Sequence, residues 1–162
     1  VNAFAQAAVT FTSQNYGAGQ KDRCKKIFRL SMLFSILFCG TLSCIFVLGR
    51  DFFLHLYTTD EAVYRFAVQR ILIVTTLEFL TSVYEISAGA MRGLGHSLLP
   101  AVITCVGSCV LRLIWIATVC RIYHTFWVLL IIYPISWVIT GVSMMTAYHF
   151  IKKRVFRKTL TV

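Results

Sequence analysis

Two glutamates stand in an otherwise apolar stretch of the sequence. Glu78 and Glu85 are the only charged residues between positions 71 and 91, and they lie seven residues apart. In a regular α-helix that spacing is two turns, so both side chains share one face. A carboxylate near the middle of a bilayer costs about 2.5–3.5 kcal/mol, so this face predicts a protein-lined or watery cavity. The face also takes in polar, small and cationic residues: Arg70, Thr81, Ala88, Gly89 and Arg92.

The chemistry that such a pair supports is ion coupling. Burial raises the proton affinity of a carboxylate and a nearby cation lowers it, so a carboxylate held between these effects can load and release a proton as access changes. Glu78 and Glu85 are therefore candidates for coupling to protons or sodium. The alternative is structural: each glutamate pairs with an arginine such as Arg112 or Arg70, or hydrogen-bonds a neighbouring helix.

Three further features of the apolar stretches have structural or functional interpretations. Arg112 lies deep in its stretch and is either a structural ion-pair partner or a gating residue. The spacing of Gly89 and Gly93 predicts a close approach of two helices. Pro134 removes a backbone donor and predicts a kink in the last helix, as a hinge or as fixed shape.

No catalytic or metal-binding pattern occurs in the sequence. There is no CxxC pair, no cluster of histidines, no glycine-rich phosphate loop and no nucleophile elbow. We therefore expect no enzyme activity, no metal and no cofactor, with energy supplied by an ion gradient or by a larger complex. The cysteines are expected to be small buried apolar residues, and the histidines to be wet residues near span ends. These residues are Cys24, Cys39, Cys44, Cys105, Cys109, Cys120, His55, His96, His124 and His149.

The composition is that of a membrane protein. Of the 162 residues, 58% are apolar and only 14% are charged, against about 45–50% and about 25% in soluble domains. These figures exclude a disordered tail, a polar-surfaced nucleic-acid module and a secreted disulfide scaffold. Because the chain opens on Val1 inside an apolar run, we expect it to be a piece of a longer protein.

Four apolar stretches are long enough, at 1.5 Å per residue, to cross a hydrocarbon core of about 30 Å. We therefore expect an all-α, polytopic transmembrane helix bundle. A shorter leading stretch ends at Gly17-Ala18-Gly19, where glycine can close a helix, and is expected to be the second half of a fifth span. The predicted spans are 1–16 (partial), 28–49, 66–91, 97–120 and 125–150.

The net charge of +10 is mainly a topology signal. Eleven of the 16 Lys and Arg residues fall within 21–29, at Arg92 or within 152–158. An even number of spans places both clusters on one side, which the positive-inside rule makes the cytoplasm. We therefore expect a multi-pass plasma-membrane protein with a cytoplasmic C-terminus and no nucleic-acid partner. On the outer side, a short interfacial segment is predicted from Phe52, Phe53, Leu54, Leu56 and Tyr57.

Two short runs resemble a known family. Residues 11–20, followed by the first basic cluster, resemble the end of an even-numbered helix in the multidrug and toxic compound extrusion (MATE) family: FTSQNYGAGQ. Residues 87–97, with Pro100 after them, resemble the exit of that family's tenth helix and the turn that follows: SAGAMRGLGHS. Arg92, Gly93 and Gly95 form this exit-motif turn.

The resemblance implies a twelve-helix transporter made of two six-helix lobes. This chain would supply the end of helix 8 and helices 9 to 12, which form a partial C-terminal lobe and require the missing N-terminal lobe as a partner. Such transporters exchange a cationic, amphipathic compound for protons or sodium across the plasma membrane by alternating access. In family members with a coupling acid on the tenth helix, that acid corresponds to Thr81 here, one turn from each of Glu78 and Glu85.

From the same resemblance we expect certain residues to face the central cleft between the lobes. Phe79 and Tyr84 offer aromatic surface to a cationic substrate. The cleft-lining candidates are Thr81, Tyr84, Arg112, Gln14 and Asn15.

Two rival functions remain open from the sequence. A flippase for lipid-linked sugars or polysaccharide shares the helix-bundle architecture, but its cavity would carry several cations for pyrophosphate, whereas the candidates here are mainly acidic. A non-transporting membrane subunit would use the glutamates only to hold helices together. A channel is less favoured because no repeated filter-like segment is present.

Overall fold

The computed structural model describes residues 1–123 and 125–158; of Lys158 it describes the backbone alone. His124 and the side chain of Lys158, which the sequence placed in an outer turn and in a basic cluster, lie outside the described residues. Every element in the described ranges is helical, so the predicted all-α class is confirmed. The elements are α1 (Asn2–Gly17), α2 (Lys21–Leu48), α3 (Arg50–Tyr57), α4 (Glu61–Arg70), η1 (Ile71–Thr75), η2 (Glu78–Leu80), α5 (Thr81–Gly93), α6 (Leu98–Thr104), η3 (Cys105–Val110), α7 (Leu111–Ile122) and α8 (Phe126–Lys158).

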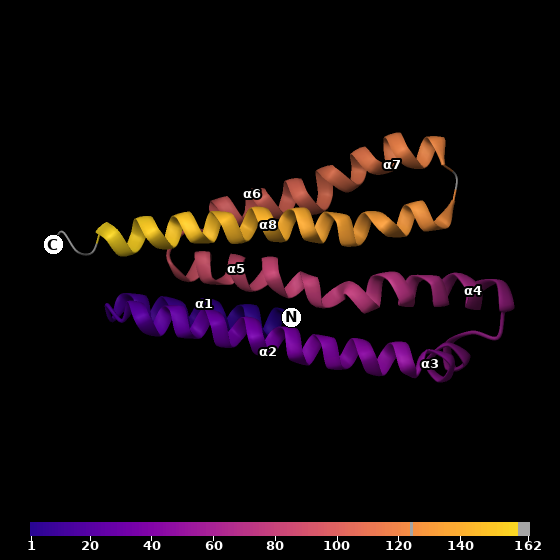
Figure 1. Cartoon of the computed structure of the whole chain (residues 1–162), viewed down its shortest axis with the longest axis horizontal. Coiled ribbons are helices and arrows are strands. Elements are labelled where there is room, and N and C mark those ends of the chain that lie inside the picture. The colour runs from indigo at the N-terminus through magenta and orange to yellow at the C-terminus, as the bar shows by residue number, and fades with distance from the viewer. Residues whose placement is uncertain (124, 159–162) are drawn as a thin grey trace.

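Four continuous helical rods in the described part of the chain are long and apolar enough to cross a membrane. They run over Lys21–Leu48, Glu61–Gly93, Leu98–Ile122 and Phe126–Arg157. The second extends beyond its predicted span at both ends, and each of the others extends beyond its span at one end and is one residue short at the other. The shortest has 25 residues, which at 1.5 Å per residue exceeds a hydrocarbon core of about 30 Å. α1 has only 16 residues and begins midway along α2 (Figure 1); that it is half of a span stays a prediction.

The core lies along α5, which packs against both α1 and α8. Its main cluster joins small and apolar residues of α5 to larger ones of α8, and all its members are at least nine-tenths buried: Ala88, Ala90, Met91, Leu94, Met144, Tyr148, Ile151 and Val155. The outer surface carries large apolar side chains instead of polar ones. Phe34, Leu37 and Phe38 of α2 are all more than half exposed on this chain. A surface of this kind is stable only against lipid or against further protein.

Two glycines bring α5 directly onto α1. A Cβ atom added at Gly89 would stand 2.7 Å from the carbonyl oxygen of Ala5, and one at Gly93 would stand 2.8 Å from that of Val9. These distances are shorter than any ordinary carbon contact, so only glycine permits this approach. The close packing predicted from the spacing of Gly89 and Gly93 is therefore confirmed.

The two basic clusters lie at the same end of the bundle, as an even number of spans requires. The Lys21 ammonium group donates a hydrogen bond to the Phe156 carbonyl at 2.9 Å. The rings of Phe28 and Tyr148 stack with centroids 4.2 Å apart. α2 therefore begins beside the end of α8 (Figure 1); that this end faces the cytoplasm stays a prediction.

The expectation that the cysteines are buried is wrong for half of them. Cys24 is buried, but Cys44, Cys105 and Cys109 are exposed on the surface of this chain. The reason is that a lipid-facing position accepts a small apolar side chain as readily as a core position does. All six are free thiols, and no group of His, Cys, Asp or Glu within the described ranges could hold a metal ion.

Candidate functional site

The rod that carries both glutamates is not a regular α-helix. Between α4 and α5 it widens into the π-helical segment η1, where the Thr76 N–H bonds to the carbonyl of Ile71, and then tightens into the 3₁₀ turn η2. Leu77 joins the two with φ −99° and ψ 2°. Since the number of residues per turn changes at each junction, the predicted straight polar face running from Arg70 to Arg92 is wrong.

The change of pitch separates the surroundings of the two carboxyl groups. Glu78 is exposed on this chain, Glu85 is half-buried, and Thr81 between them is buried. In the 3₁₀ turn, residues three apart lie above one another, and the Thr81 hydroxyl donates to the Glu78 carbonyl at 2.7 Å. Thr81 is therefore occupied in holding the turn that presents Glu78.

Neither glutamate forms an ion pair with another residue in the described part of the chain. The ion pairs within the described residues join Lys25 to Asp22, Arg50 to Asp51 and Arg65 to Glu61. The structural alternative, in which each glutamate pairs with Arg112 or Arg70, is therefore not what the described residues form. Both carboxyl groups keep oxygen atoms free for a cation or a proton.

Three other predicted site residues lie within electrostatic range of Tyr84. Its phenol interacts electrostatically with Glu85, Arg112 and Glu78, which come from α5, α7 and η2. Tyr84 itself is half-buried. These two acids, one base and one aromatic ring define what we call the Tyr84 neighbourhood, a set of groups within electrostatic range of one phenol.

Arg112 is fixed to α8 by uncharged partners. Its Nε donates to the Ser136 hydroxyl at 3.0 Å, and its guanidinium carbon lies 4.6 Å from the centre of the Tyr133 ring. Ser136 in turn donates to the Tyr133 carbonyl at 2.8 Å, beside Pro134, which has no N–H of its own. Sequence reasoning missed both partners; the signal that could have found them is the polar Ser136 in an apolar span, two residues after Pro134. α8 continues as a helix through this region.

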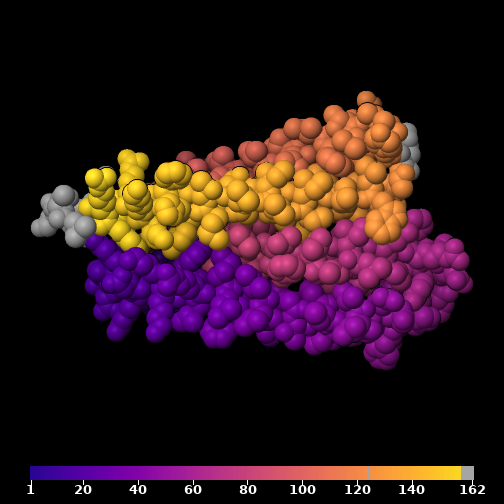
Figure 2. All heavy atoms as spheres, in the orientation of Figure 1, coloured from indigo at the N-terminus to yellow at the C-terminus, as the bar shows by residue number. Residues whose placement is uncertain are grey.

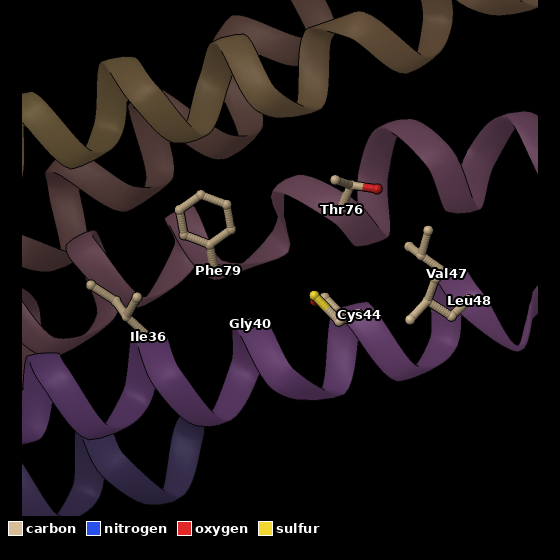
Figure 3. A pocket seen from close by; sticks show the side chains of 8 residues that line it. Ile36, Gly40, Cys44, Val47, Leu48, Thr76 and Phe79 are labelled. Atoms are coloured by element: carbon tan, nitrogen blue, oxygen red, sulfur yellow. The ribbon is translucent and has the colours of Figure 1, made fainter.

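An apolar cavity of about 430 Å³ lies between α2 and the irregular part of the glutamate-bearing rod. Figure 3 shows Thr76 on that rod opposite Cys44 on α2, and Phe79 opposite Gly40. Gly40 widens the cavity, because a Cβ atom placed there would meet nothing within 4 Å. Phe79, the residue after Glu78, is thus placed in an apolar recess. The lining residues are Ile36, Gly40, Ser43, Cys44, Val47, Leu48, Thr76 and Phe79.

Two cleft candidates do not join this neighbourhood. Gln14 and Asn15 lie in the last turn of α1, and α1 packs in parallel on α5 with Thr12 at the level of Gly93. They are therefore level with the end of α5, several turns beyond Tyr84. The side-chain amide of Asn15 donates within its own helix, to the Phe11 carbonyl at 2.8 Å.

The exit-motif turn terminates and caps α5. Gly95 has φ +84°, a conformation that favours glycine. Its N–H bonds to the Arg92 carbonyl at 3.0 Å, and the His96 N–H bonds to the Met91 carbonyl at 3.0 Å. This arrangement satisfies the last carbonyls of α5. Gly93 serves the packing on α1, and the Arg92 side chain is exposed.

α1 ends in the same way, although the sequence reading did not connect the two turns. Gly19 has φ +72°, its N–H bonds to the Tyr16 carbonyl at 3.0 Å, and the Gln20 N–H bonds to the Asn15 carbonyl at 2.8 Å. Each turn has glycines two residues apart, GAGQ and GLGH. That shared pattern was the available signal that both helices end in the same kind of turn.

Similarity to known proteins covers most of this structure. The MatE family model matches residues 1–118, from α1 into α7. A Thermotoga maritima protein described as "Probable multidrug resistance protein NorM" is 26% identical over 98 residues, which are 60% of this chain and 21% of that protein. The chain thus matches about a fifth of the length of this curated relative.

Proposed function

This chain belongs to the MatE family, and from that premise we propose that the full-length protein is a secondary active transporter. It exchanges cationic amphipathic compounds for protons or sodium across the plasma membrane by alternating access. The observation that carries the proposal is the family match over a chain whose described residues form four helices long and apolar enough to span a membrane. The relative named as a multidrug resistance protein supports the choice of substrate class.

The pairing of charge and apolar surface suits an amphipathic cation. Glu78 precedes Phe79, and Phe79 lines the apolar cavity beside α2. A substrate with a positive group and an apolar body needs a carboxylate for the first and an aromatic or aliphatic surface for the second. In this proposal Glu78 and Glu85 bind the substrate cation and the coupling ion in competition.

Arg112 supplies a fixed positive charge to the same neighbourhood. Because Ser136 and Tyr133 hold its guanidinium on α8, it stays near the two carboxylates without neutralising either of them in an ion pair. Its charge opposes the simultaneous occupancy of both glutamates by cations. Exchange requires that binding of one cation disfavours binding of the other, so that substrate and coupling ion replace each other at the site.

The remaining parts of the proposal follow from the same premise. The partners are the bilayer, the substrate and the missing N-terminal lobe, without a nucleic acid, and an ion gradient replaces any cofactor or enzymatic step. We propose a cytoplasmic C-terminus as well; the two basic clusters that meet at one end of the bundle support this orientation.

Dye efflux from vesicles that contain the full-length protein tests this function. A proton gradient and a sodium gradient are applied separately to the wild type and to Glu78→Gln, Glu85→Gln and the control Glu61→Gln, which alters an exposed acid of α4. We expect ion-coupled efflux to be lost in at least one of the first two variants and kept in the control. Unchanged transport and coupling in both Glu78→Gln and Glu85→Gln would sink the coupling role.

The same vesicles separate the rival functions. A flippase would translocate a lipid-linked sugar and not the dye, and a non-transporting subunit would move neither compound under either gradient. Either result contradicts the proposal.

A further inference from the structure

One end of the bundle carries a dense and nearly uncompensated positive charge. It is formed where α2 begins and α8 ends, and the only acid among its described residues is Asp22, which pairs with Lys25 at 2.8 Å. Six of the cations are exposed and define what we call the basic end surface: Arg23, Lys26, Arg29, Lys153, Arg154 and Arg157.

Contacts between the two helices join these clusters into one surface. The Lys21 ammonium group caps the end of α8 by donating to the Phe156 carbonyl at 2.9 Å. The Lys25 ammonium group lies 5.9 Å from the centre of the Phe156 ring. Figure 2 shows the end of α8 lying against the N-terminal helices at this end of the molecule. Residues more than a hundred positions apart therefore present their charge together.

The length of the helices sets the depth of this surface. α8 has 33 residues, about 50 Å of helix, against about 30 Å of hydrocarbon and about 40–45 Å with the headgroup regions. Its last turns, with Lys153, Arg154 and Arg157, therefore stand at or beyond headgroup depth. The charged start of α2 stands at the same level because Lys21 contacts Phe156.

We propose that the basic end surface binds the phosphate groups of anionic phospholipids in the adjoining leaflet. Topology alone accounts for cations on one side of the membrane, but it does not require clusters from two distant segments to be in contact. Arginine presents a planar fork of donors that matches phosphate oxygens, and clusters of Lys and Arg next to a span attract anionic headgroups. Headgroup depth favours a lipid phosphate over a free one. This inference does not depend on the transport proposal.

Lipid retention by the full-length protein tests the proposal. Detergent-solubilised protein is titrated with short-chain phosphatidylglycerol or with phosphatidylcholine, and bound lipid is measured after gel filtration. The triple variant Arg23→Gln, Arg154→Gln, Arg157→Gln is compared with a matched control at the other end of the bundle, Arg65→Gln, Arg70→Gln, Arg121→Gln. We expect the first set to weaken phosphatidylglycerol binding on the order of a hundredfold and the control set to leave it unchanged.

Two further measurements test the proposal even if the variant Arg23→Gln, Arg154→Gln, Arg157→Gln folds poorly. Phosphatidylglycerol binding by the wild type should weaken steeply with added salt, and the charge-preserving set Arg23→Lys, Arg154→Lys, Arg157→Lys should retain most of it. Equal binding of both lipids, equal loss in both glutamine sets, or salt-independent binding would each overturn the proposal. Competition by inorganic phosphate at millimolar levels would also overturn it, because the surface would then be a site for free phosphate.

Discussion

Gly89 of α5 lies against the backbone of Ala5 in α1, so closely that an added Cβ atom would stand 2.7 Å from the Ala5 carbonyl oxygen. We expect Gly89→Val to destabilise the bundle by about 1–3 kcal/mol or more, because the obstructing atom is backbone and cannot rotate away. The measurement is the thermal unfolding midpoint of the full-length protein in detergent. Gly40→Ala is the control: it adds a Cβ atom in open space and should leave the midpoint unchanged or slightly raised. Equal midpoints for the two variants would contradict this role of Gly89.

Gly95 and Gly19 end their helices in the left-handed conformation. We expect Gly95→Ala and Gly19→Ala each to cost about 1–2 kcal/mol, since a Cβ atom is strained at positive φ. Gly17→Ala is the matched control. Gly17 lies beside Gly19 at the end of α1, but it has no positive φ and has open space around it. Thermal unfolding in detergent measures all three variants. A control as destabilised as Gly95→Ala would show that bulk, and not backbone conformation, matters at these turns.

The spans and the shared side of the two basic clusters could be predicted from the sequence. The thickness of the hydrocarbon core sets how long an apolar run must be, and the positions of the charged residues indicate which ends lie on the same side of the membrane. Any run of about 20 apolar residues must cross the membrane or be buried. An even number of crossings puts both basic clusters on one side, but it does not by itself bring Lys21 onto Phe156. The packing of Gly89 and Gly93 was predictable for a similar reason, since small residues one turn apart serve close approach.

The pitch of the glutamate-bearing rod could not be predicted in this way. Hydropathy is nearly the same whether Ile71–Thr75 forms α- or π-type hydrogen bonds, and the choice is made by packing against α2 and α8. The partners of Arg112 were missed because an arginine in an apolar span was expected to find a carboxylate, whereas a hydroxyl and an aromatic face satisfy it here.

The hydrogen bond between Arg112 and Ser136 should make a measurable contribution to stability. We expect Arg112→Lys to destabilise the protein by about 1–3 kcal/mol, because lysine keeps the charge but cannot reproduce the Nε–Ser136 hydrogen bond. Ser136→Ala removes the same bond from the other side, so the double variant should cost less than the sum of the two single ones. Chemical unfolding of the three variants gives the coupling energy, and strictly additive effects would contradict the interaction.

The corner between α3 and α4 should respond to acid. Tyr64 donates to Asp51 at 2.6 Å, and this hydrogen bond, with help from Arg50, lowers the pKa of the Asp51 carboxyl. A carboxyl with a lowered pKa stabilises the folded corner above its unfolded pKa, and the stabilisation is lost as the pH falls through the folded pKa. We expect Tyr64→Phe to return the pKa of Asp51 towards its ordinary value, measured by NMR of carboxyl-labelled aspartate. Tyr57→Phe, on an exposed tyrosine, should not change it, and an unchanged pKa in Tyr64→Phe would contradict the assignment.

Phe79 places an aromatic ring in the apolar cavity beside Glu78, so its loss should weaken substrate binding more than ion coupling. In the transport assay we expect Phe79→Ala to raise the KM for a cationic dye by about 5- to 30-fold, as loss of a partly desolvated cation–π contact and of apolar contact implies. Phe79→Trp should keep most of the affinity, because indole offers a larger aromatic face. Phe34→Ala, on the exposed face of α2, is the matched control for loss of a phenyl ring from an apolar surface. If both alanine variants raise the KM equally, the ring acts through general packing, and the cavity does not receive the substrate.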